Sequence, residues 1–256
     1  MLLAIDVGNS NLTLGLYEGS ELRQNWRLET SARRTSDEYG LLVSQLLQNS
    51  NYQRGDLDDV IIASVVPNLT PHLEDFTQKA LGLKAMVVGP GLKTGMPVKY
   101  NPPKDVGADR IVNGVAAYQR FQTACIVVDF GTATTFDSIS AAGHYQGGAI
   151  APGVQISMDA LFQRAAKLPK VDVHKPSHVV GRSTVESMQS GAFFGYVGLV
   201  DGLVRRMKAE MKEDEIHVLA TGGLAASIAE ESETLALVDE NLTLEGLRLI
   251  HALNAG

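Results

Sequence analysis

The sequence is poor in cysteine and has no long hydrophobic run, and each shortage excludes a class of protein. The single cysteine, Cys125, excludes a disulfide framework and zinc sites built from several cysteines, and it fits a reducing cytoplasm. A charge already stands at Asp6, so the opening residues do not resemble a signal peptide. No apolar run approaches the roughly 20 residues of a membrane helix. We therefore expect a cytoplasmic protein with no membrane partner.

Basic residues are also in short supply. The formal net charge is −7 and no basic stripe is present, which argues against nucleic acid as a partner. The six histidines show no pairing with carboxylates at metal-ligand spacing. His174 and His178 are four residues apart, yet Pro176 interrupts any helix between them. We expect all six histidines to be structural or exposed.

The sequence does contain an acidic strand end followed by a small turn. The run LLAIDVGNSN begins at Leu2, reaches Asp6 through apolar residues and then turns at Gly8. Glycine lets a backbone approach a ligand closely, and small polar side chains offer donors, so such a turn suits phosphate or metal-bound phosphate. A plain turn between two strands is the alternative that this stretch alone leaves open.

In the first half of the chain, the pattern predicts three strands in a meander, followed by alternating helices and strands. A helix over 36–50 has one apolar face, and Ser36 or Asp37 is its candidate N-cap. Another helix is expected to begin near Ala108. The remaining predicted elements are strands 2–7, 12–19, 21–30, 59–67 and 84–90 and a helix over 69–82.

The second half repeats this opening from Ala124. A buried strand that ends in Asp129 precedes a Gly-Thr turn and two further strands, which form a second meander. The predicted strands are 124–130, 134–143, 144–153, 215–223 and 234–240, and the predicted helices are 154–169, 183–212, 224–232 and 242–256.

The shared opening of the two halves predicts an internal duplication. IDVGNSNLTLGL and VDFGTATTFDSI both contain a strand, an Asp-x-Gly turn and a second strand. Because Asp-x-Gly is short, chance similarity is the alternative. We expect a duplicated α/β fold with domains 1–118 and 119–256, whose Asp6 and Asp129 turns line one cleft. A ligand held by two such turns is a nucleoside triphosphate.

Neither turn matches the common nucleotide motifs. No G-x-x-x-x-G-K-[ST] pattern occurs, and each turn leads into a strand rather than a helix, which also excludes a dinucleotide fingerprint. A hairpin turn offers donors without a helix dipole, so the phosphate charge must be neutralised by metal ions, for which the strand-end aspartates are the ligands. The residues therefore predict a two-domain phosphotransferase with a metal-bound nucleotide.

Several segments resemble a known superfamily. DVGNSN, DFGTATTFD and ATGG resemble the two phosphate segments and the adenosine segment of the acetate and sugar kinase, heat-shock protein and actin superfamily. A narrower resemblance, nearly end to end, is to type III pantothenate kinase. It is carried by VKYNPPKDVGADRIVNGVAAY, GGAIAPG, AAKLPKVD and GRSTVESMQSGAFFGYVGLVDG. The resemblance implies duplicated actin-like (ribonuclease H-like) domains, each a mixed sheet with an antiparallel meander followed by parallel βα units.

The same resemblance implies a reaction. It is transfer of the γ-phosphate of ATP to the primary hydroxyl of pantothenate, which gives 4'-phosphopantothenate in the first step of coenzyme A biosynthesis. It also implies Mg²⁺, a monovalent cation (K⁺ or NH₄⁺) and a homodimer. Because the family also resembles a protein once described as a transcriptional accessory factor, a regulatory binding protein of the same fold without kinase activity is the alternative function.

The resemblance assigns the acceptor site. The implied substrate-binding residues are Tyr100, Gly107, Ala108, Asp109, Arg110 and Thr184. Asp109 is the implied general base, Arg110 pairs with the pantothenate carboxylate, and Tyr100 closes over the loop. The residues alone leave simpler roles open, namely a helix cap for Asp109 or Thr184, a surface salt bridge for Arg110 and a loop anchor for Tyr100.

The resemblance also assigns the nucleotide and metal sites. The implied phosphate-binding residues are Asp6, Val7, Gly8, Asn9, Ser10, Asn11, Leu12, Thr13 and Thr132. Asp6 would hold Mg²⁺, directly or through water, and Thr132 would donate to an ATP phosphate. Asp129 is the implied ligand of the monovalent cation, and a second magnesium ligand is its alternative role.

Two groups of glycines suggest further roles, one near the nucleotide and one in helix packing. Thr221 to Gly223 permit close approach of an adenine or ribose, although any tight strand-to-helix turn has the same preference. A stripe of four glycines in helix 183–212 indicates close packing, either within the chain or at a two-fold dimer seam. Since the resemblance implies a dimeric family, we expect these glycines to lie at the two-fold dimer interface. The stripe consists of Gly191, Gly195, Gly198 and Gly202.

Overall fold

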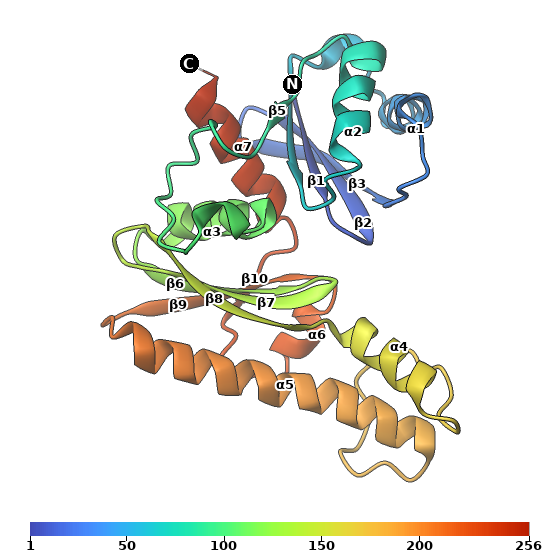
Figure 1. Ribbon diagram of the computed structural model, residues 1–256, viewed down its shortest axis with the longest axis vertical. Coiled ribbons are helices and arrows are strands. Elements are labelled where there is room, and N and C mark those ends of the chain that lie inside the picture. The colour runs from blue at the N-terminus through green and yellow to red at the C-terminus, as the bar shows by residue number, and fades with distance from the viewer. Residues whose placement is uncertain (256) are drawn as a thin grey trace. The chain divides into compact units, whose positions relative to one another are not determined.

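The computed structural model describes residues 1–255, which form two compact units (Figure 1). Unit 1 contains residues 1–96, 101–116 and the chain from Thr243 onward, and unit 2 contains residues 97–100 and 117–242. The domain boundary between residues 118 and 119 stays a prediction, and the units differ from it mainly because the last helix belongs to unit 1. Gly256, the end of the predicted helix 242–256, lies outside the described residues.

A five-stranded mixed sheet forms the centre of unit 1, in the order β3-β2-β1-β4-β5. The first three strands form the predicted meander, and β1 pairs parallel with β4. The strands are β1 (Leu2–Val7), β2 (Asn11–Glu18), β3 (Glu21–Glu29), β4 (Asp59–Ser64) and β5 (Met86–Val87). The helices are α1 (Ser36–Asn49), α2 (Thr70–Phe76), α3 (Ala108–Phe121), which ends in unit 2, and α7 (Leu242–Asn254), with short helical turns η1 (Arg54–Asp56), η2 (Thr77–Leu81) and η3 (Pro103–Asp105).

Unit 2 repeats this topology. Its sheet has the order β10-β9-β6-β7-β8, and β6 pairs antiparallel with β7 and parallel with β9. The strands are β6 (Ala124–Phe130), β7 (Ala133–Ile139), β8 (Tyr145–Pro152), β9 (Ile216–Gly222) and β10 (Leu237–Val238), and the helices are α4 (Val154–Arg164), α5 (Thr184–Met211) and α6 (Ala225–Ala229). The predicted duplicated α/β fold, with a meander and parallel βα units in each half, is therefore confirmed.

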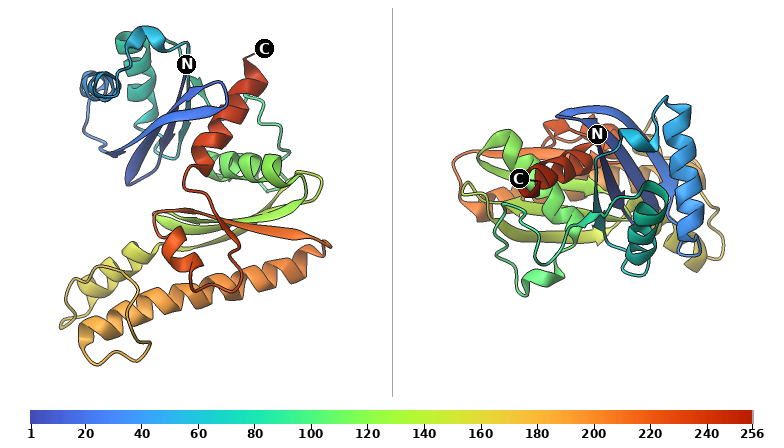
Figure 2. Two further views of the ribbon diagram at one scale, coloured as in Figure 1. Left: turned by 180° about the vertical axis from the view of Figure 1, so that it is seen from behind. Right: turned by 90° about the horizontal axis from the view of Figure 1, so that it is seen from above.

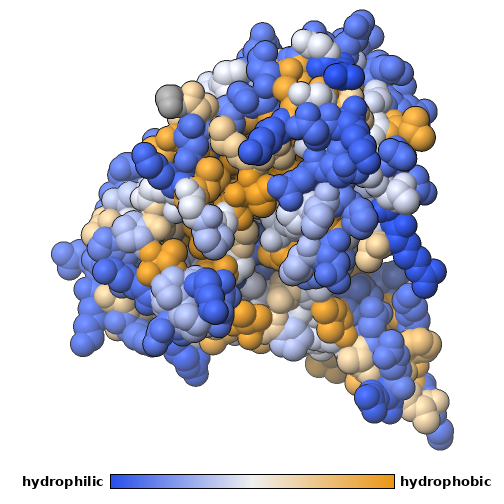
Figure 3. All heavy atoms as spheres, turned by 45° about the horizontal axis from the view of Figure 1, so that its top comes forward, coloured by the Kyte–Doolittle hydropathy of each residue, from blue (hydrophilic) through white to orange (hydrophobic). Residues whose placement is uncertain are grey.

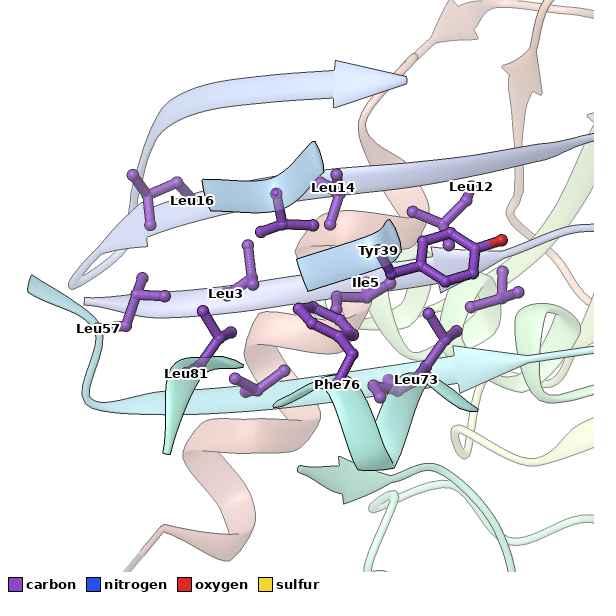
Figure 4. Close-up of a cluster of buried hydrophobic side chains, with 14 of the residues drawn as sticks. Leu3, Ile5, Leu12, Leu14, Leu16, Tyr39, Leu57, Leu73, Phe76 and Leu81 are labelled. Carbon is purple, nitrogen blue, oxygen red and sulfur yellow. The ribbon is translucent and has the colours of Figure 1, made fainter. Parts of the chain in front are cut away.

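Alternating side chains of β1 divide the core of unit 1 into two faces. One face packs against α1 and α2, and Figure 4 shows its side chains converging, among them Leu3, Ile5, Leu14, Tyr39 and Phe76. Leu2 and Ala4 lie on the other face, with side chains of α3 and α7. Since successive residues of a strand point to opposite faces, Asp6 lies on the α3 and α7 face.

The sheet of unit 2 follows the same alternation. Ile126, Val128 and Phe130 of β6 are buried against α5 and α6, and the left view of Figure 2 shows α5 running along the sheet. Each large apolar side chain buried in this way contributes about 1.5–3 kcal/mol to stability. Asp129 falls between two of these positions and so lies on the face opposite α5. Asp6 and Asp129 thus occupy equivalent places in the two sheets.

The N-cap residues of two helices differ from the sequence prediction. The N-cap of α1 is Thr35, not Ser36 or Asp37, and it forms a reciprocal capping box with Glu38. The N-cap of α5 is Ser183, whose side chain accepts the backbone N–H of Glu186. Thr184 is therefore the first helical residue rather than a cap. A side chain cannot cap from inside the helix, because the cap must accept an N–H from two or three residues further on.

None of the helices found among residues 1–255 is long and apolar enough to cross a membrane. Most predicted elements are present, and the exceptions concern length. Helix α4 ends at Arg164, five residues before the predicted end at 169, and β5 and β10 each contain only two residues.

Candidate active site

The first predicted phosphate turn connects β1 to β2. The backbone N–H of Gly8 donates to the carbonyl oxygen of Asn11 at 3.0 Å, which closes the turn. A Cβ atom on Gly8 would lie 3.1 Å from that same oxygen, so a larger residue would widen the turn. Asn9 and Ser10 at the tip are exposed. The turn can therefore offer polar groups to a ligand.

Asp6 lies at the carboxyl end of β1, where the parallel strand β4 also ends. Its cross-strand partners are Thr13 and Ala63, and its side chain is half-buried. Just beyond the two strands, the backbone N–H of Val65 donates to the carbonyl oxygen of Val7 at 3.0 Å. Carboxyl ends of parallel strands are where ligands bind in open α/β sheets.

Asp109 stands in the first turn of α3. Its carboxylate accepts the backbone N–H of Arg110 at 2.8 Å. Burial raises the pKa of Asp109, and the hydrogen bond and positive charge from Arg110 offset only part of that effect. A carboxylate with a raised pKa is a stronger proton acceptor than an exposed one. The side chain thus has the chemistry of a general base, which a cap does not require.

Asp109 and Asp6 occupy the same end and the same face of the sheet in unit 1. A Cβ atom on Gly107, just before α3, would lie 3.6 Å from Cγ1 of Val65, the residue that follows β4. The start of α3 therefore lies at the carboxyl ends of β1 and β4. Since Asp6 faces α3 and α7, unit 1 brings together the predicted magnesium ligand, the predicted base and the first phosphate turn.

The second phosphate turn, between β6 and β7, is one residue shorter. The backbone N–H of Gly131 donates to the carbonyl oxygen of Ala133 at 3.0 Å, and the N–H of Gly153 donates to the carbonyl oxygen of Thr132 at 3.1 Å. A Cβ atom on Gly153 would overlap that Thr132 oxygen and lie 2.7 Å from the carbonyl oxygen of Gly131. Gly153 is therefore required for the close packing of this turn.

Gly222 and Gly223, which the sequence predicts to approach adenosine, contact the backbone of Phe130 at the end of β6. Gly222 has a φ angle of +92°, and a Cβ atom there would lie 2.6 Å from the carbonyl oxygen of Phe130. Gly223 donates its N–H to that oxygen at 3.2 Å, and its own Cβ position has nothing within 4 Å. Gly222 is thus needed for a contact inside unit 2, whereas Gly223 has room for a ligand.

Asp129 leads into a buried polar network that sequence reasoning missed. Asp129 pairs with Thr135 across β6 and β7, and the hydroxyl of Thr135 donates to Asp137 at 3.2 Å. Asp137 is fully buried, and its other carboxylate oxygen accepts the hydroxyl of Tyr145 at 2.7 Å. Since β7 has the sequence ATTFDSI, with polar residues on both sides of Asp137, no local pattern in the sequence indicates that this carboxylate is buried and needs hydrogen-bonding partners.

Tyr100 belongs to a short segment that pairs with β8 in unit 2. The backbone N–H of Lys99 donates to the carbonyl oxygen of Tyr145 at 2.8 Å, and the N–H of Tyr145 donates to that of Pro97 at 3.0 Å. The backbone therefore anchors the segment, and the Tyr100 ring stays exposed and meets Tyr145 edge-on with centroids 6.5 Å apart. The exposed ring is compatible with the predicted role of covering a substrate.

Thr184 lines a pocket of about 870 Å³ in unit 2. The pocket lies between α4 and the first half of α5, and Arg182, Ser183 and Thr184 form one edge of it. Among the described residues, the other predicted substrate residues do not line this pocket. The structure therefore places Gly107 to Arg110 in unit 1, and Tyr100 and Thr184 at separate places in unit 2.

Comparison with known proteins decides the family. Residues 2–206 match the family described as type III pantothenate kinase. The chain belongs to the type III pantothenate kinase family. Type III pantothenate kinases from Geotalea uraniireducens and Geobacter sulfurreducens are 56% and 55% identical to it over 254 residues, which is 99% of this chain and 99% of each relative. A type III pantothenate kinase from Myxococcus xanthus is 54% identical over the same length.

Solved structures confirm the fold but are more distant. A Campylobacter jejuni protein described as a conserved Baf family transcriptional activator aligns over 99% of this chain and 98% of its own, with a TM-score of 0.61 and 20% identity. A Sinorhizobium meliloti protein described as a 2-dehydro-3-deoxygalactonokinase aligns over 100% of this chain and 96% of its own, with a TM-score of 0.59 and 12% identity. At these identities the likeness shows the fold alone, the actin-like fold of sugar kinases.

The donors of this type III pantothenate kinase family member fit hard cations. Asp6 and Asp129 each offer a half-buried carboxylate at a strand end, and an oxygen of Asp129 lies 3.6 Å from the Cβ position of Gly131 in the turn. Within residues 1–255, no three His, Cys, Asp or Glu side chains form a metal-binding group. A cation at either aspartate would thus complete its ligand shell with carbonyl, water or phosphate oxygens, as Mg²⁺ does in nucleotide sites.

Proposed function

We propose that this chain transfers the γ-phosphate of ATP to the primary hydroxyl of pantothenate, producing 4'-phosphopantothenate in the first step of coenzyme A biosynthesis. Membership of the type III pantothenate kinase family supports the substrate. The observation that carries the mechanism is the placement of Asp109 at the same end and face of the unit 1 sheet as Asp6. A base and a metal-binding carboxylate at one sheet edge suit phosphoryl transfer.

Asp109 acts as the general base in this proposal. Its carboxylate accepts the proton of the attacking hydroxyl, late in a loose transition state in which a moderate base is sufficient. The raised pKa of Asp109 increases its affinity for that proton. The neighbouring Arg110 is buried, which suits a guanidinium that pairs with the carboxylate of pantothenate.

The two turns hold the phosphates of ATP in this proposal, through residues 6–13 in unit 1 and Thr132 in unit 2. Asp6 holds Mg²⁺, directly or through water, and Asp129 binds the monovalent cation, K⁺ or NH₄⁺. When bound, these cations neutralise charge on the phosphates. Asp6 and Asp129 orient them from equivalent strand positions, which supports related roles in the two units.

The acceptor site in this proposal consists of Tyr100, the loop from Gly107 to Arg110, and Thr184. The exposed ring of Tyr100 and the exposed side chain of Thr184 are both available to a substrate. Gly107 permits the loop to pass close to Val65. The backbone of residues 107–109 and the Arg110 side chain then hold pantothenate next to the base.

We also infer a homodimer that pairs through α4 and α5. Cβ atoms at Gly191, Gly195 and Gly198 would meet nothing within 4 Å, so these glycines do not serve packing inside the described chain. Figure 3 shows apolar side chains among hydrophilic ones at its lower right end, which α4 and the start of α5 form. Ile156, Leu161 and Phe162 are there 45%, 42% and 44% exposed. A second copy of the chain would cover this face.

The reaction itself supports a cytoplasmic location, because the proposed donor is ATP. The one thiol of the chain, Cys125, is buried, and burial raises its pKa to about 12, so it stays a protonated and unreactive thiol. That state is compatible with a reducing compartment.

The proposal is tested by ADP release from purified protein with ATP, Mg²⁺ and pantothenate, in buffers whose only monovalent cation is K⁺ or Na⁺. We expect turnover that depends on pantothenate, requires K⁺ and falls about 10³-fold or more in Asp109→Asn. Light scattering on the same sample checks the dimer. Folded dimer without turnover in either buffer would favour the regulatory alternative, and turnover that survives in Asp109→Asn would leave Asp109 with only a structural role.

A further inference from the structure

Carbonyl oxygens of the first phosphate turn accept hydrogen bonds from the protein itself. Four of them accept hydrogen bonds from backbone or side-chain donors in unit 1. They belong to Val7, Gly8, Ser10 and Asn11. A carbonyl oxygen carries partial negative charge and repels phosphate, whereas a backbone N–H attracts it. A turn that binds phosphate must therefore direct its carbonyl groups away from the ligand.

One residue, Thr30, holds two of these four oxygens. It follows directly after β3. Its backbone N–H donates to the carbonyl oxygen of Ser10 at 3.0 Å, and its hydroxyl donates to that of Gly8 at 2.7 Å. The backbone bond extends the ladder in which Asn11 pairs with Glu29, and any residue but proline would form it. The hydroxyl bond, by contrast, requires threonine or serine.

The segment around Thr30 is itself fixed in place. The Arg34 side chain donates to the carbonyl oxygen of Glu29 at 3.2 Å, and its guanidinium lies 5.3 Å from the ring centroid of Tyr39. The hydroxyl of Tyr39 donates to the carbonyl oxygen of Ser31 at 3.3 Å. Since Tyr39 is fully buried in α1, Thr30 has a rigid support from which to hold the turn.

We propose that Thr30 is a positioning residue for the nucleotide, whose hydroxyl holds the Gly8 carbonyl away from the phosphate so that the polar donors of the turn face ATP. This inference rests on the proposed function, in which the turn binds ATP phosphates. Without the hydroxyl, the Gly8 oxygen has no side-chain donor and is free to rotate toward the ligand. The loss then falls on nucleotide binding rather than on pantothenate.

The test compares Thr30→Val with Thr30→Ser and with a matched control, Thr77→Val. Valine keeps the volume of threonine but removes the hydroxyl, and serine keeps the hydroxyl. Thr77 lies in the same unit, and its hydroxyl donates to the carbonyl oxygen of Glu74 at 2.9 Å, away from the turn. Cooperative thermal unfolding is checked for each variant first. Steady-state kinetics and calorimetric titration with MgADP are then measured.

We expect Thr30→Val to raise KM for MgATP and Kd for MgADP about tenfold, equivalent to about 1.4 kcal/mol. The KM for pantothenate and kcat should change less than about threefold, Thr30→Ser should restore nucleotide affinity to within about twofold, and Thr77→Val should leave it unchanged. Equal behaviour of Thr30→Val and Thr77→Val would overturn the proposal, as would a loss that affects both substrates alike.

Asp6→Asn separates the failure of this inference from failure of the proposed function. If Asp6→Asn weakens MgATP binding and Thr30→Val does not, the turn binds nucleotide but Thr30 does not position it. If neither variant affects nucleotide binding, the assignment of the turn to ATP is wrong, and the role of Thr30 is wrong with it.

Discussion

The two phosphate turns have similar sequences but are held in different ways. In unit 1, residues 7–11 are fixed by the side-chain hydroxyl of Thr30 and by the backbone N–H groups of Thr30 and Val65. In unit 2, residues 130–133 are fixed by backbone groups that approach closely at Gly153 and Gly222. A side-chain bond can be replaced by a related residue, whereas a close backbone approach tolerates only glycine. Duplicated loops have therefore acquired different sensitivities to substitution.

The largest effect expected from this difference is at Gly153. Gly153→Ala would place a methyl group on the Thr132 carbonyl oxygen, and backbone cannot move aside as a flexible side chain can. We expect a loss of stability of about 3 kcal/mol or more and a fall in kcat/KM for ATP of at least about 100-fold. Denaturant unfolding and the ADP-release assay measure the two effects. A variant with wild-type stability and activity would show that the turn in unit 2 adapts.

Two buried or half-buried carboxylates extend the comparison, because their pKa values shift in opposite directions. Burial alone would raise the pKa of Asp201 in α5, but hydrogen bonds outweigh it and the pKa is lowered. The hydroxyls of Ser232 and Thr234 donate at 2.6 and 2.7 Å, and the backbone N–H groups of Glu233 and Thr234 donate at 3.1 Å. Asp201 thus stabilises unit 2, whereas burial disfavours the ionised form of Asp109, the proposed base, in unit 1.

The expected pH dependence follows from these directions. The folded pKa of Asp201 is lowered, so its contribution to stability is present above the unfolded pKa of about 3.9 and is lost as pH falls through the folded value. The folded pKa of Asp109 is raised, so its contribution is present below about 3.9 and is lost as pH rises through the folded value. Of these two carboxylates, only Asp201 keeps its contribution to stability as the pH rises.

We therefore expect Asp201→Asn to cost about 1–3 kcal/mol at pH 7, with kcat within about threefold of wild type. Asp109→Asn should be at least as stable as wild type although inactive.

In wild type, kcat/KM should fall on the acid side with an apparent pKa above about 3.9. Thermal unfolding and activity across pH 4–8 measure all three quantities, and a destabilised Asp109→Asn would contradict the assignment.

The smallest effect is expected at Gly8 in the unit 1 turn. Gly8 corresponds to Gly131 in the unit 2 turn. Gly8→Ala brings a Cβ atom to 3.1 Å from the Asn11 oxygen, a contact that a shift of a few tenths of an ångström relieves. We expect kcat/KM for ATP to fall about three- to tenfold, with stability changed by less than about 1 kcal/mol. A loss as large as that of Gly153→Ala would mean that both turns depend on glycine equally.

Local patterns in the sequence explain why so much of the fold was predictable. The apolar runs that end in Asp6 and Asp129 are strands in both units, because strand alternation and turn residues act over a few positions. The two misplaced caps were also visible locally. Thr35 and Glu38, like Ser183 and Glu186, have the spacing of a capping box, which outranks the neighbouring Ser and Asp candidates.

Features that depend on distant residues were not predictable in the same way. Asp137 is satisfied by Tyr145 from the next strand, and its burial cannot be read from its own neighbours. Thr30 acts on Gly8 across 22 positions of the chain. Pantothenate as the acceptor came from the resemblance to a family, because the residues alone indicate only a phosphotransferase with a metal-bound nucleotide.

The return of α7 to unit 1 has a consequence for synthesis of the protein. Leu244, Leu247 and Ile250 of α7 are buried against the β1 face that carries Leu2 and Ala4. Unit 2 lies almost wholly within residues 117–242, so the ribosome releases it before α7. Strand β1 is thus translated well before α7, which covers part of one of its faces. Unit 2 can complete its core while unit 1 still exposes part of one face of its sheet, which would reverse the usual N-to-C order of folding.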